Sequence, residues 1–290
     1  MNRTETHKVP RIPEARRLQE YGVGIFDATA TKSALKKLLK KKCITVDGIT
    51  ASTATMIRGG ETIQLTLPAL QNPGKSLELS LEVIYEDEFL AAINKPAGIP
   101  VSGNKFRTIT NALPQNLLPS KLPDACRPQP VHRLDYPTTG LLLVGKTREC
   151  VRRLNKMFED KEISKTYYAI VIGQLKPEGE ILAEIDFKPA KTSYFVKSMV
   201  ASERFGQLNL VQLIPATGRR HQLRKHLSGI GHPILGDKQY GEEGKILSGK
   251  GLYLHASHLR ITHPISGEKL KLSAPLPERF RNIFPGFDTK

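Results

Sequence analysis

Acidic residues, cysteines and long apolar runs are all scarce in this sequence. The 290 residues include only 28 Asp and Glu but 44 Lys and Arg, which gives a formal net charge of +16. Cysteine occurs three times, at Cys43, Cys126 and Cys150, without the CxxC spacing of a metal or redox site. No stretch approaches the roughly 20 apolar residues of a membrane span, and the N-terminus lacks a signal-peptide core. We therefore expect free thiols, a cytoplasmic location and no membrane partner.

The excess positive charge is concentrated at the two ends of the chain. Residues 1–60 hold 12 Lys/Arg against 5 Asp/Glu, and residues 201–290 hold 14 against 7. Residues 61–200 are nearly balanced, with 18 against 16. A cationic surface gains free energy by displacing counterions from phosphates. The distribution therefore predicts a polyanionic partner that is gripped at two places.

A small N-terminal domain is predicted over residues 16–67, behind a polar, flexible lead-in over residues 1–15. A helix is expected after Thr31 or Ser33, because Leu35 and Leu39 fall on one face of it. The segment ITVDGITA then predicts a hairpin with an Asp-Gly turn. Most other positions of the helix are basic, namely Lys32, Lys36, Lys37, Lys40 and Lys41.

A basic helix followed by a small hairpin resembles the alpha-L RNA-binding domain, which occurs in a small-subunit ribosomal protein and in RNA-modifying enzymes. Taken alone, the lysines would suit a solvated helix face equally well. With the hairpin behind them, an RNA-binding surface is favoured, and the resemblance implies that these lysines contact RNA.

A Pro-, Gly- and Asn-rich linker is predicted over residues 68–78, followed by a larger domain over residues 79–290. Apolar strands dominate the larger domain. Thr147 is placed to cap a helix over RECVRRLNKMFEDKE, and Thr217 to cap another through RRHQLRKHL. The predicted class is α+β, with a mostly antiparallel sheet and helices beside it.

Candidate catalytic residues gather in four segments, of which AAINKPAGIPVSG, with Asn94, Lys95 and Pro96 at the end of a strand, carries the weakest signal. In HRLDYPTTGLLLVGKT, Arg133 and Asp135 lie on a loop that leads into a buried strand, and a nearby Arg keeps a carboxylate ionised. The alternative is a structural Arg–Asp pair that closes a turn. In ATGRRHQLRKHLSG, Arg220 and Arg224 are four residues apart and are predicted to share a helix face with access to phosphates or a carboxylate. In SKTYYAIVIG, Tyr167 stands at the mouth of a strand, where it would be either a base-stacking ring or core.

These segments, in the order HRLDYPTTGLLL, KTYYAIVIG, TGRRHQLRKH, GHPILGD and LHASHLRITHP, resemble the RluA family of pseudouridine synthases over about residues 79–278. The resemblance implies the pseudouridine synthase catalytic fold and an isomerase that needs neither metal nor redox cofactor. It implies that Asp135 is the catalytic aspartate and that Arg133 takes the place of the flipped base. It further implies that Tyr167 packs on the uracil and Arg224 pairs with Asp135. Arg219 and Arg220 would contact RNA.

Two positions depart from the family pattern. Thr139 stands where serine is usual, and Ser102 where many members have histidine. The second change leaves the contribution of that loop to substrate choice in doubt. Whether Asp135 attacks the sugar or accepts a proton is not decided by sequence. Ribosomal RNA is favoured over transfer RNA as the partner, and nothing requires more than a monomer.

Three rival interpretations stand beside the enzyme. A zinc site could use His255, His258 and His263, perhaps with His132 or His232. No cysteine or acidic cluster lies near these histidines in the sequence, which argues against such a site. A two-acid glycosidase mechanism would need a second carboxylate beside Asp135, and the nearest acids, Glu149, Glu159 and Asp160, lie on a predicted helix. A non-catalytic RNA-binding protein fits the charge equally, but binding alone does not require an aspartate in a cationic cleft.

Overall fold

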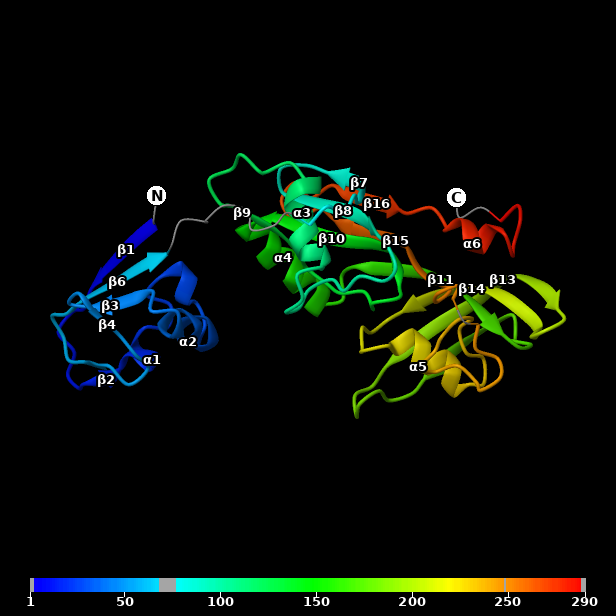
Figure 1. The fold of residues 1–290 in the computed structure, drawn as a ribbon, viewed down its shortest axis with the longest axis horizontal. Helices are drawn as coiled ribbons and strands as arrows, with labels where there is room; N and C mark the ends of the chain where they lie inside the picture. The colour runs from blue at the N-terminus through cyan, green and yellow to red at the C-terminus, as the bar shows by residue number, and fades with distance from the viewer. Residues whose placement is uncertain (1–2, 68–76, 248, 288–290) are drawn as a thin grey trace. The chain divides into compact units, whose positions relative to one another are not determined.

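The computed structural model describes residues 3–67, 77–247 and 249–287, which fall in two compact units, Met1–Lys75 and Ser76–Lys290 (Figure 1). Each unit packs around a hydrophobic core of its own. The boundary falls within the predicted linker, 68–78, of which 68–76 lie outside the described residues. No helix in the described ranges is long and apolar enough to cross a bilayer.

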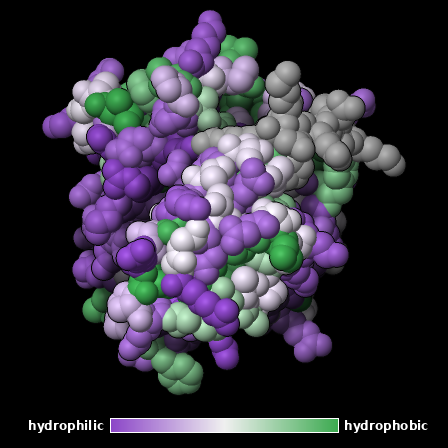
Figure 2. Space-filling view, turned by 90° about the vertical axis from the view of Figure 1, so that its left-hand side faces the viewer, coloured by the Kyte–Doolittle hydropathy of each residue, from purple (hydrophilic) through white to green (hydrophobic). Residues whose placement is uncertain are grey.

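The N-terminal unit is a four-stranded antiparallel sheet, in the order β1-β6-β3-β4, with a basic helix. Helix α2 (Lys32–Lys40) begins as predicted, since the Thr31 hydroxyl accepts the Ala34 N–H at 3.2 Å. Leu35 and Leu39 are buried, whereas the five predicted lysines are exposed. The face that Figure 2 shows is mainly hydrophilic. The remaining elements are β1 (Arg3–Lys8), β2 (Arg16–Arg17), α1 (Leu18–Tyr21), η1 (Asp27–Thr29), β3 (Ile44–Val46), β4 (Ile49–Thr50), β5 (Met56–Ile57) and β6 (Thr62–Leu67).

The expectation of a flexible lead-in over residues 1–15 is wrong for residues 3–8, which form β1 and pair with β6 along their whole length. Side chains alternate between half-buried at Glu5 and His7 and exposed at their neighbours. His7 Nε2 lies 2.9 Å from the Tyr21 hydroxyl, which fixes the strand to α1. Because the alternation is polar, it carries no apolar signal of period two, and the strand was missed.

The C-terminal unit contains a ten-stranded sheet among its described residues. The main path runs β12-β13-β14-β11-β15-β10-β8-β7, with β16 against β15 and β9 against β10. All pairings are antiparallel except β10–β15, so the predicted α+β class with a mostly antiparallel sheet is confirmed. The strands are β7 (Glu82–Glu86), β8 (Leu90–Lys95), β9 (Ala125–Pro130), β10 (Thr139–Thr147), β11 (Ser164–Ile172), β12 (Glu178–Leu182), β13 (Lys191–Ser202), β14 (Gly206–Pro215), β15 (Leu254–Thr262) and β16 (Lys269–Ser273). The helices are α3 (Ile109–Asn116), α4 (Arg148–Glu159), α5 (Gln222–Gly229) and α6 (Glu278–Arg281).

The two halves of this sheet meet where β10 pairs with β15 in parallel over two positions. The strands approach so closely that a Cβ on Gly140, which has φ of 111°, would collide with the Ala256 carbonyl. Beside it, the Thr139 hydroxyl lies 2.8 Å from His255 Nδ1. This contact connects β10 to β15, and it uses the hydroxyl that Thr139 shares with the serine of the family pattern. Hydrophobic cores lie on either side of the junction, around α5 and around α3 and α4.

Helix α4 begins as predicted, because the Thr147 hydroxyl accepts the Cys150 N–H. The prediction for α5 was wrong, since this helix begins at Gln222 rather than after Thr217. The buried Gln222 side chain accepts from the Thr217 hydroxyl at 2.7 Å and from the Arg219 N–H at 3.0 Å, and holds that segment as a turn. Arg219 and Arg220 therefore lie on the turn, and Arg220 does not share a helix face with Arg224.

Candidate active site

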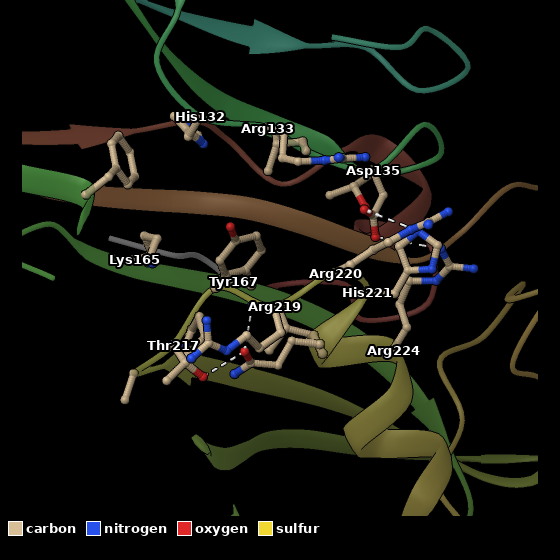
Figure 3. A pocket seen from close by; sticks show the side chains of 18 of the residues that line it. His132, Arg133, Asp135, Lys165, Tyr167, Thr217, Arg219, Arg220, His221 and Arg224 are labelled. Carbon is tan, nitrogen blue, oxygen red and sulfur yellow. Dashed lines mark hydrogen bonds and ion pairs between the residues drawn. The ribbon is translucent and has the colours of Figure 1, made fainter. Parts of the chain in front are cut away.

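A cavity of about 680 Å³ opens at the junction of the two sheet halves (Figure 3). Its walls are the loop that leads into β10, the first part of β11, the end of α4, and the turn before α5. That volume is in the range of small-molecule sites in proteins. Six cationic side chains and two acidic ones line it, namely Arg133, Lys161, Lys165, Arg219, Arg220 and Arg224 against Asp135 and Glu159. The cavity is therefore suited to an anionic ligand.

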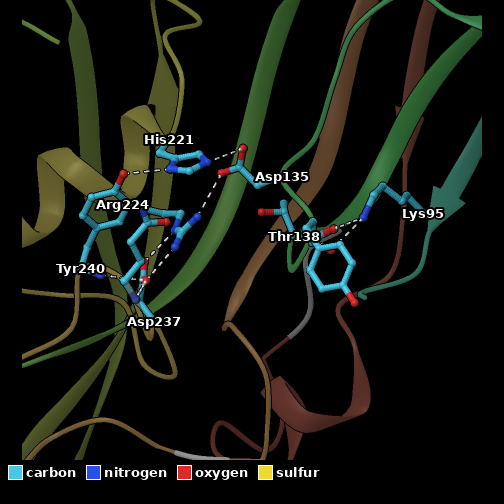
Figure 4. Close-up of polar contacts among 9 residues, drawn as sticks. Lys95, Asp135, Thr138, His221, Arg224, Asp237 and Tyr240 are labelled. Carbon is cyan, nitrogen blue, oxygen red and sulfur yellow. Dashed lines mark hydrogen bonds and ion pairs between the residues drawn. The ribbon is translucent and has the colours of Figure 1, made fainter. Parts of the chain in front are cut away.

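Asp135 faces the start of α5 across this cavity (Figures 3 and 4). Its Oδ1 lies 3.6 Å from His221 Nε2, and its Oδ2 lies 3.6 Å from Arg224 Nη1. The side chain is 16% exposed, so the carboxylate is accessible from the cavity. Both contacts are longer than hydrogen bonds, and the oxygens are left free to act on a bound molecule.

Arg224 is held by a second, buried carboxylate. Its Nε and Nη2 donate to Asp237 at 2.7 and 2.8 Å in a bidentate pair, and its guanidinium lies 4.9 Å from the centre of the Tyr240 ring. Burial alone would lower the pKa of Arg224, but Asp237 and Asp135 raise it above its usual value. Burial likewise opposes ionisation of Asp237, yet the Arg224 guanidinium and two backbone N–H groups hold its pKa below the usual range. Arg224 therefore stays charged, with its third nitrogen fixed toward Asp135.

His221 reaches Asp135 because its backbone is left-handed, with φ of 55°. Its Nδ1 lies 2.9 Å from the Tyr240 hydroxyl. Burial lowers the pKa of His221, and the nearby Arg224 charge acts in the same direction while Asp135 opposes it. Burial and the Arg224 charge therefore favour the neutral form of the ring. A neutral ring that accepts from Tyr240 at Nδ1 presents an Nε2–H to Asp135.

Lys95 holds the Asp135 loop from the other side (Figure 4). It is fully buried at the end of β8, and its ammonium donates to the carbonyls of Pro96, Tyr136 and Thr138 at 2.9 to 3.3 Å. Burial lowers the pKa of Lys95 to about 8, although the Asp135 charge acts to raise it. Two of these carbonyls, those of Tyr136 and Thr138, come directly after Asp135 in the chain, so we assign Lys95 a positioning role for the Asp135 loop.

The depressed pKa of Lys95 predicts a pH dependence of stability. Above pH 8 the folded protein releases this proton, while the unfolded chain holds it up to its usual pKa of 10.5. The unfolded state then binds more protons, so the free energy of unfolding rises with pH over this window. Relative to Lys95→Met, the wild type should gain up to about 3 kcal/mol between pH 8 and 10.5.

Urea denaturation at closely spaced pH values measures this difference, and subtracting the variant removes the titration of other groups. Lys161→Met, at an exposed position of the cavity rim, is the matched control. Parallel curves for wild type and Lys95→Met would contradict the assignment.

Tyr167 and His132 shape the cavity floor and wall. Tyr167 points into the cavity from β11 (Figure 3), and burial followed by the Asp135 charge raises the pKa of its hydroxyl. It stays a neutral aromatic surface at neutral pH. His132 accepts the Leu143 N–H at 2.9 Å and lies 4.7 Å from Phe158 between ring centres. Burial lowers the pKa of His132 to about 3, so it positions the loop and carries no charge.

The structure brings most of the predicted site residues together. Asp135, Tyr167 and Arg224 line the same cavity, as do the exposed Arg133 and the turn residues Arg219 and Arg220. The predicted lysines of α2 belong to the other unit. Sequence reasoning gave no role to four residues of this site, His221, Asp237, Tyr240 and Lys95. The first three stand in or just after the quoted motifs, but their partners are set by the long-range path of the chain.

The histidines of the zinc interpretation do not converge. His255 contacts Thr139, His263 Nε2 lies 3.0 Å from Asp87, and His258 contacts Ser257. Within residues 3–67, 77–247 and 249–287, no group of three or more His, Cys, Asp or Glu is placed to hold a metal ion. Each of these histidines is therefore accounted for by its own neighbour.

A second acid close to Asp135 is not supplied by α4. Glu149 pairs with Arg152 and Arg153 on the helix surface, and Asp160 pairs with Lys156. Glu159 lines the cavity, but its side chain is 76% exposed and lies 3.9 Å from Lys156. The arrangement offers one enclosed carboxylate, an adjacent guanidinium and an aromatic ring, which suits nucleophilic or base chemistry on an anionic substrate.

Comparison with known proteins gives one family. Residues 90–229 match the family model described as RNA pseudouridylate synthase. The chain is 34% identical to ribosomal large subunit pseudouridine synthase D of Nitrosomonas europaea, over 86% of this chain and 78% of the relative. It is 35% identical to ribosomal large subunit pseudouridine synthase C of Vibrio vulnificus, over 74% and 72%. The solved structure of human RNA pseudouridylate synthase domain containing 4 superposes with a TM-score of 0.55 at 28% identity, over 69% of this chain and 90% of that one.

Proposed function

The chain belongs to the RNA pseudouridylate synthase family, and from this premise we propose that it isomerises uridine in large-subunit ribosomal RNA, with Asp135 as the catalytic residue. The observation that carries the catalytic assignment is the enclosed Asp135 carboxylate, 3.6 Å from a guanidinium that another acid holds in place. The ribosomal substrate is supported by the names of the relatives, which are synthases of the large ribosomal subunit.

The reaction breaks the bond from the anomeric carbon of the ribose to ring nitrogen 1. The uracil then turns and bonds through carbon 5, which loses its proton, while nitrogen 1 takes up a proton. No electrons leave and no group is imported, so side chains of the Asp135 site are sufficient for the bond changes. The Asp135 carboxylate either attacks the sugar or accepts a proton. Arg224 places a positive charge 3.6 Å from this carboxylate, in a site that encloses the base.

The target uridine must leave its stack before it enters the cavity, which costs a few kcal/mol. Arg133, exposed at the cavity mouth, would occupy the vacated place in the RNA, and the Tyr167 ring would pack on the uracil. Thr138 also lines the cavity, but its hydroxyl oxygen is buried and has no hydrogen-bond partner among the described residues.

The N-terminal unit would supply a second RNA contact, in keeping with its resemblance to the alpha-L domain. The five lysines of the α2 region are exposed on the side away from the buried Leu35 and Leu39. Such a face binds phosphates without reading sequence. These lysines belong to the excess of positive charge near the N-terminus, and Arg219, Arg220 and Arg224 of the cavity belong to the excess near the C-terminus.

We further propose that the enzyme acts in the cytoplasm as a monomer. Cys43, Cys126 and Cys150 are free thiols, which suits a reducing compartment. Light scattering at micromolar concentration, with and without RNA, measures the oligomeric state.

Mapping of pseudouridines tests the substrate. In cells that lack the protein, specific uridines of the large-subunit ribosomal RNA should stay unmodified, and transfer RNA should be unchanged. Re-expression of the wild type should restore the modification, whereas Asp135→Asn should not. Lys36→Glu/Lys40→Glu should restore it only at high expression if α2 contributes affinity. Loss of a transfer-RNA pseudouridine with intact ribosomal RNA would contradict the proposed substrate and leave the chemistry standing.

A further inference from the structure

An aromatic side chain is displayed at the tip of the hairpin that joins β12 to β13. Ile185 and Lys188 exchange both backbone hydrogen bonds, at 3.0 and 3.2 Å, which leaves Asp186 and Phe187 as a two-residue turn. The Phe187 side chain is 97% exposed, the highest value among the exposed large hydrophobic residues of the described chain. It contributes nothing to a hydrophobic core.

The backbone of this turn makes the choice of phenylalanine costly. Asp186 has φ of 52° and Phe187 has φ of 59°, the left-handed pair of a type I′ turn. Asn or Asp followed by Gly is the preferred sequence for such a turn, because glycine adopts positive φ without a clash at Cβ. Phe187 is therefore unfavourable in two respects, because its apolar side chain is exposed to water and its backbone has a positive φ. The fold does not explain why this residue stands here.

The tip of the hairpin is fixed beside the catalytic cavity. Asp186 Oδ1 lies 2.9 Å from Lys225 Nζ on α5. Arg219, which lines the cavity, donates through Nε to the Pro189 carbonyl at 3.4 Å. The Lys225 ion pair lowers the pKa of Asp186. Phe187 is thus held at a set place next to the rim, although it is outside the cavity itself.

Cations surround this position. Lys188 is exposed on the same turn, and Arg219 and Arg220 are exposed on the facing segment. Phosphates of a strand entering the cavity would meet these charges, and its bases would then meet an aromatic face. We propose that Phe187 stacks on a nucleobase of the RNA strand next to the extruded uridine, forming a second contact outside the catalytic cavity. This rests on the proposed RNA substrate. Stacking tolerates any base, so the site would add affinity without reading sequence.

Fluorescence tests the contact directly, because the chain contains no tryptophan. Phe187→Trp introduces a single indole, and addition of large-subunit ribosomal RNA should quench its emission as the ring stacks. The matched control is Met199→Trp, 63% exposed near the other end of β13, whose emission should change little. Equal quenching of both variants would overturn the proposal. A change in Phe187→Trp emission with protein concentration alone would instead indicate contact with a second copy, and would also overturn it.

Kinetics then separates stacking from catalysis. Phe187→Gly keeps the turn geometry and should raise KM and Kd for RNA by about 10-fold. The single-turnover rate at saturating RNA should be unchanged, and the melting temperature should not fall. The slope of log Kd against log salt should also be unchanged, whereas Lys188→Ala should lower it by about one. Phe187→Trp should restore the affinity.

An unchanged Kd for Phe187→Gly, or a loss confined to the rate at saturation, would overturn the stacking contact. Activity of the wild type on the same RNA is measured separately, by tritium release from carbon 5. Failure of the proposed function would appear there, as no turnover by the wild type, and so remains distinct from failure of the Phe187 contact.

Discussion

Asp135→Asn is expected to abolish release of tritium from RNA labelled at carbon 5 of uridine, with a loss of rate of at least about 10⁴-fold. Asparagine has the shape of aspartate but neither attacks a sugar carbon nor accepts a proton at neutral pH. The loss should appear in single-turnover experiments at saturating RNA, because the side chain acts in the chemical step. A residual rate within 100-fold of the wild type would contradict the assignment.

Folding and RNA binding should both survive this change. Asp135 lies 3.6 Å from each of its charged neighbours, and Arg224 keeps its closer partner Asp237, so no buried charge is left alone. Removal of one negative charge from a cationic cavity does not oppose a polyanion. Kd for RNA should therefore stay within a few-fold, which filter binding measures.

Glu159→Gln is the matched control for this experiment. Glu159 is the other acid among the described residues that line the cavity, and its side chain is 76% exposed. Its amide variant should keep the wild-type rate. A large loss of rate in Glu159→Gln would instead revive a mechanism with two carboxylates.

Local signals in the sequence predicted much of this fold. Thr31 and Thr147 cap the helices that were expected behind them, because a cap depends on a few consecutive residues. The Asp47-Gly48 turn appears with positive φ at both residues for the same reason. The polar strand β1 was missed because its pairing with β6 is set by residues almost sixty positions away.

The site was predictable to the extent that its motifs are continuous. Asp135, Tyr167 and Arg224 were identified from short segments, and the fold places them around one cavity. The start of α5 was not predictable from the cap rule. The Thr217 hydroxyl donates to the buried Gln222 side chain, which also accepts the Arg219 N–H, so these residues form a turn before the helix. Lys95 was placed at the end of a strand, but its role was not predicted, for a different reason. Its three carbonyl partners lie one residue away and more than forty residues away, a combination that no local pattern encodes.

These contacts divide the Asp135 site into the carboxylate that we propose to react and a frame that holds it. Lys95 fixes the loop on one side of Asp135, and Arg224 stands on the other with its own orientation set by Asp237. The buried Arg224–Asp237 pair is the least replaceable part of the frame. Two opposite charges stabilise each other there, and either one alone would be buried without its partner.

Asp237→Asn should therefore lower the free energy of unfolding by about 3–5 kcal/mol. It should also lower the single-turnover rate by about 100-fold, since Arg224 would shift toward Asp135 and misplace the carboxylate. Urea denaturation and tritium release measure the two effects. Arg224→Lys should keep the charge yet lose much of the rate, because an ammonium cannot form the bidentate pair that orients the side chain.

The double variant Arg224→Met/Asp237→Asn separates stability from catalysis. With both charges removed, no buried ion is left unpaired, and the amide that replaces the Asp237 carboxylate retains an oxygen that can accept from the N–H groups of Gln239 and Tyr240. The double variant should consequently be more stable than Asp237→Asn alone, while its rate stays at or below that of the single variant. Recovery of the rate together with stability would mean that Arg224 serves the fold and does not act on the Asp135 carboxylate, and the proposed role of this arginine would then be wrong.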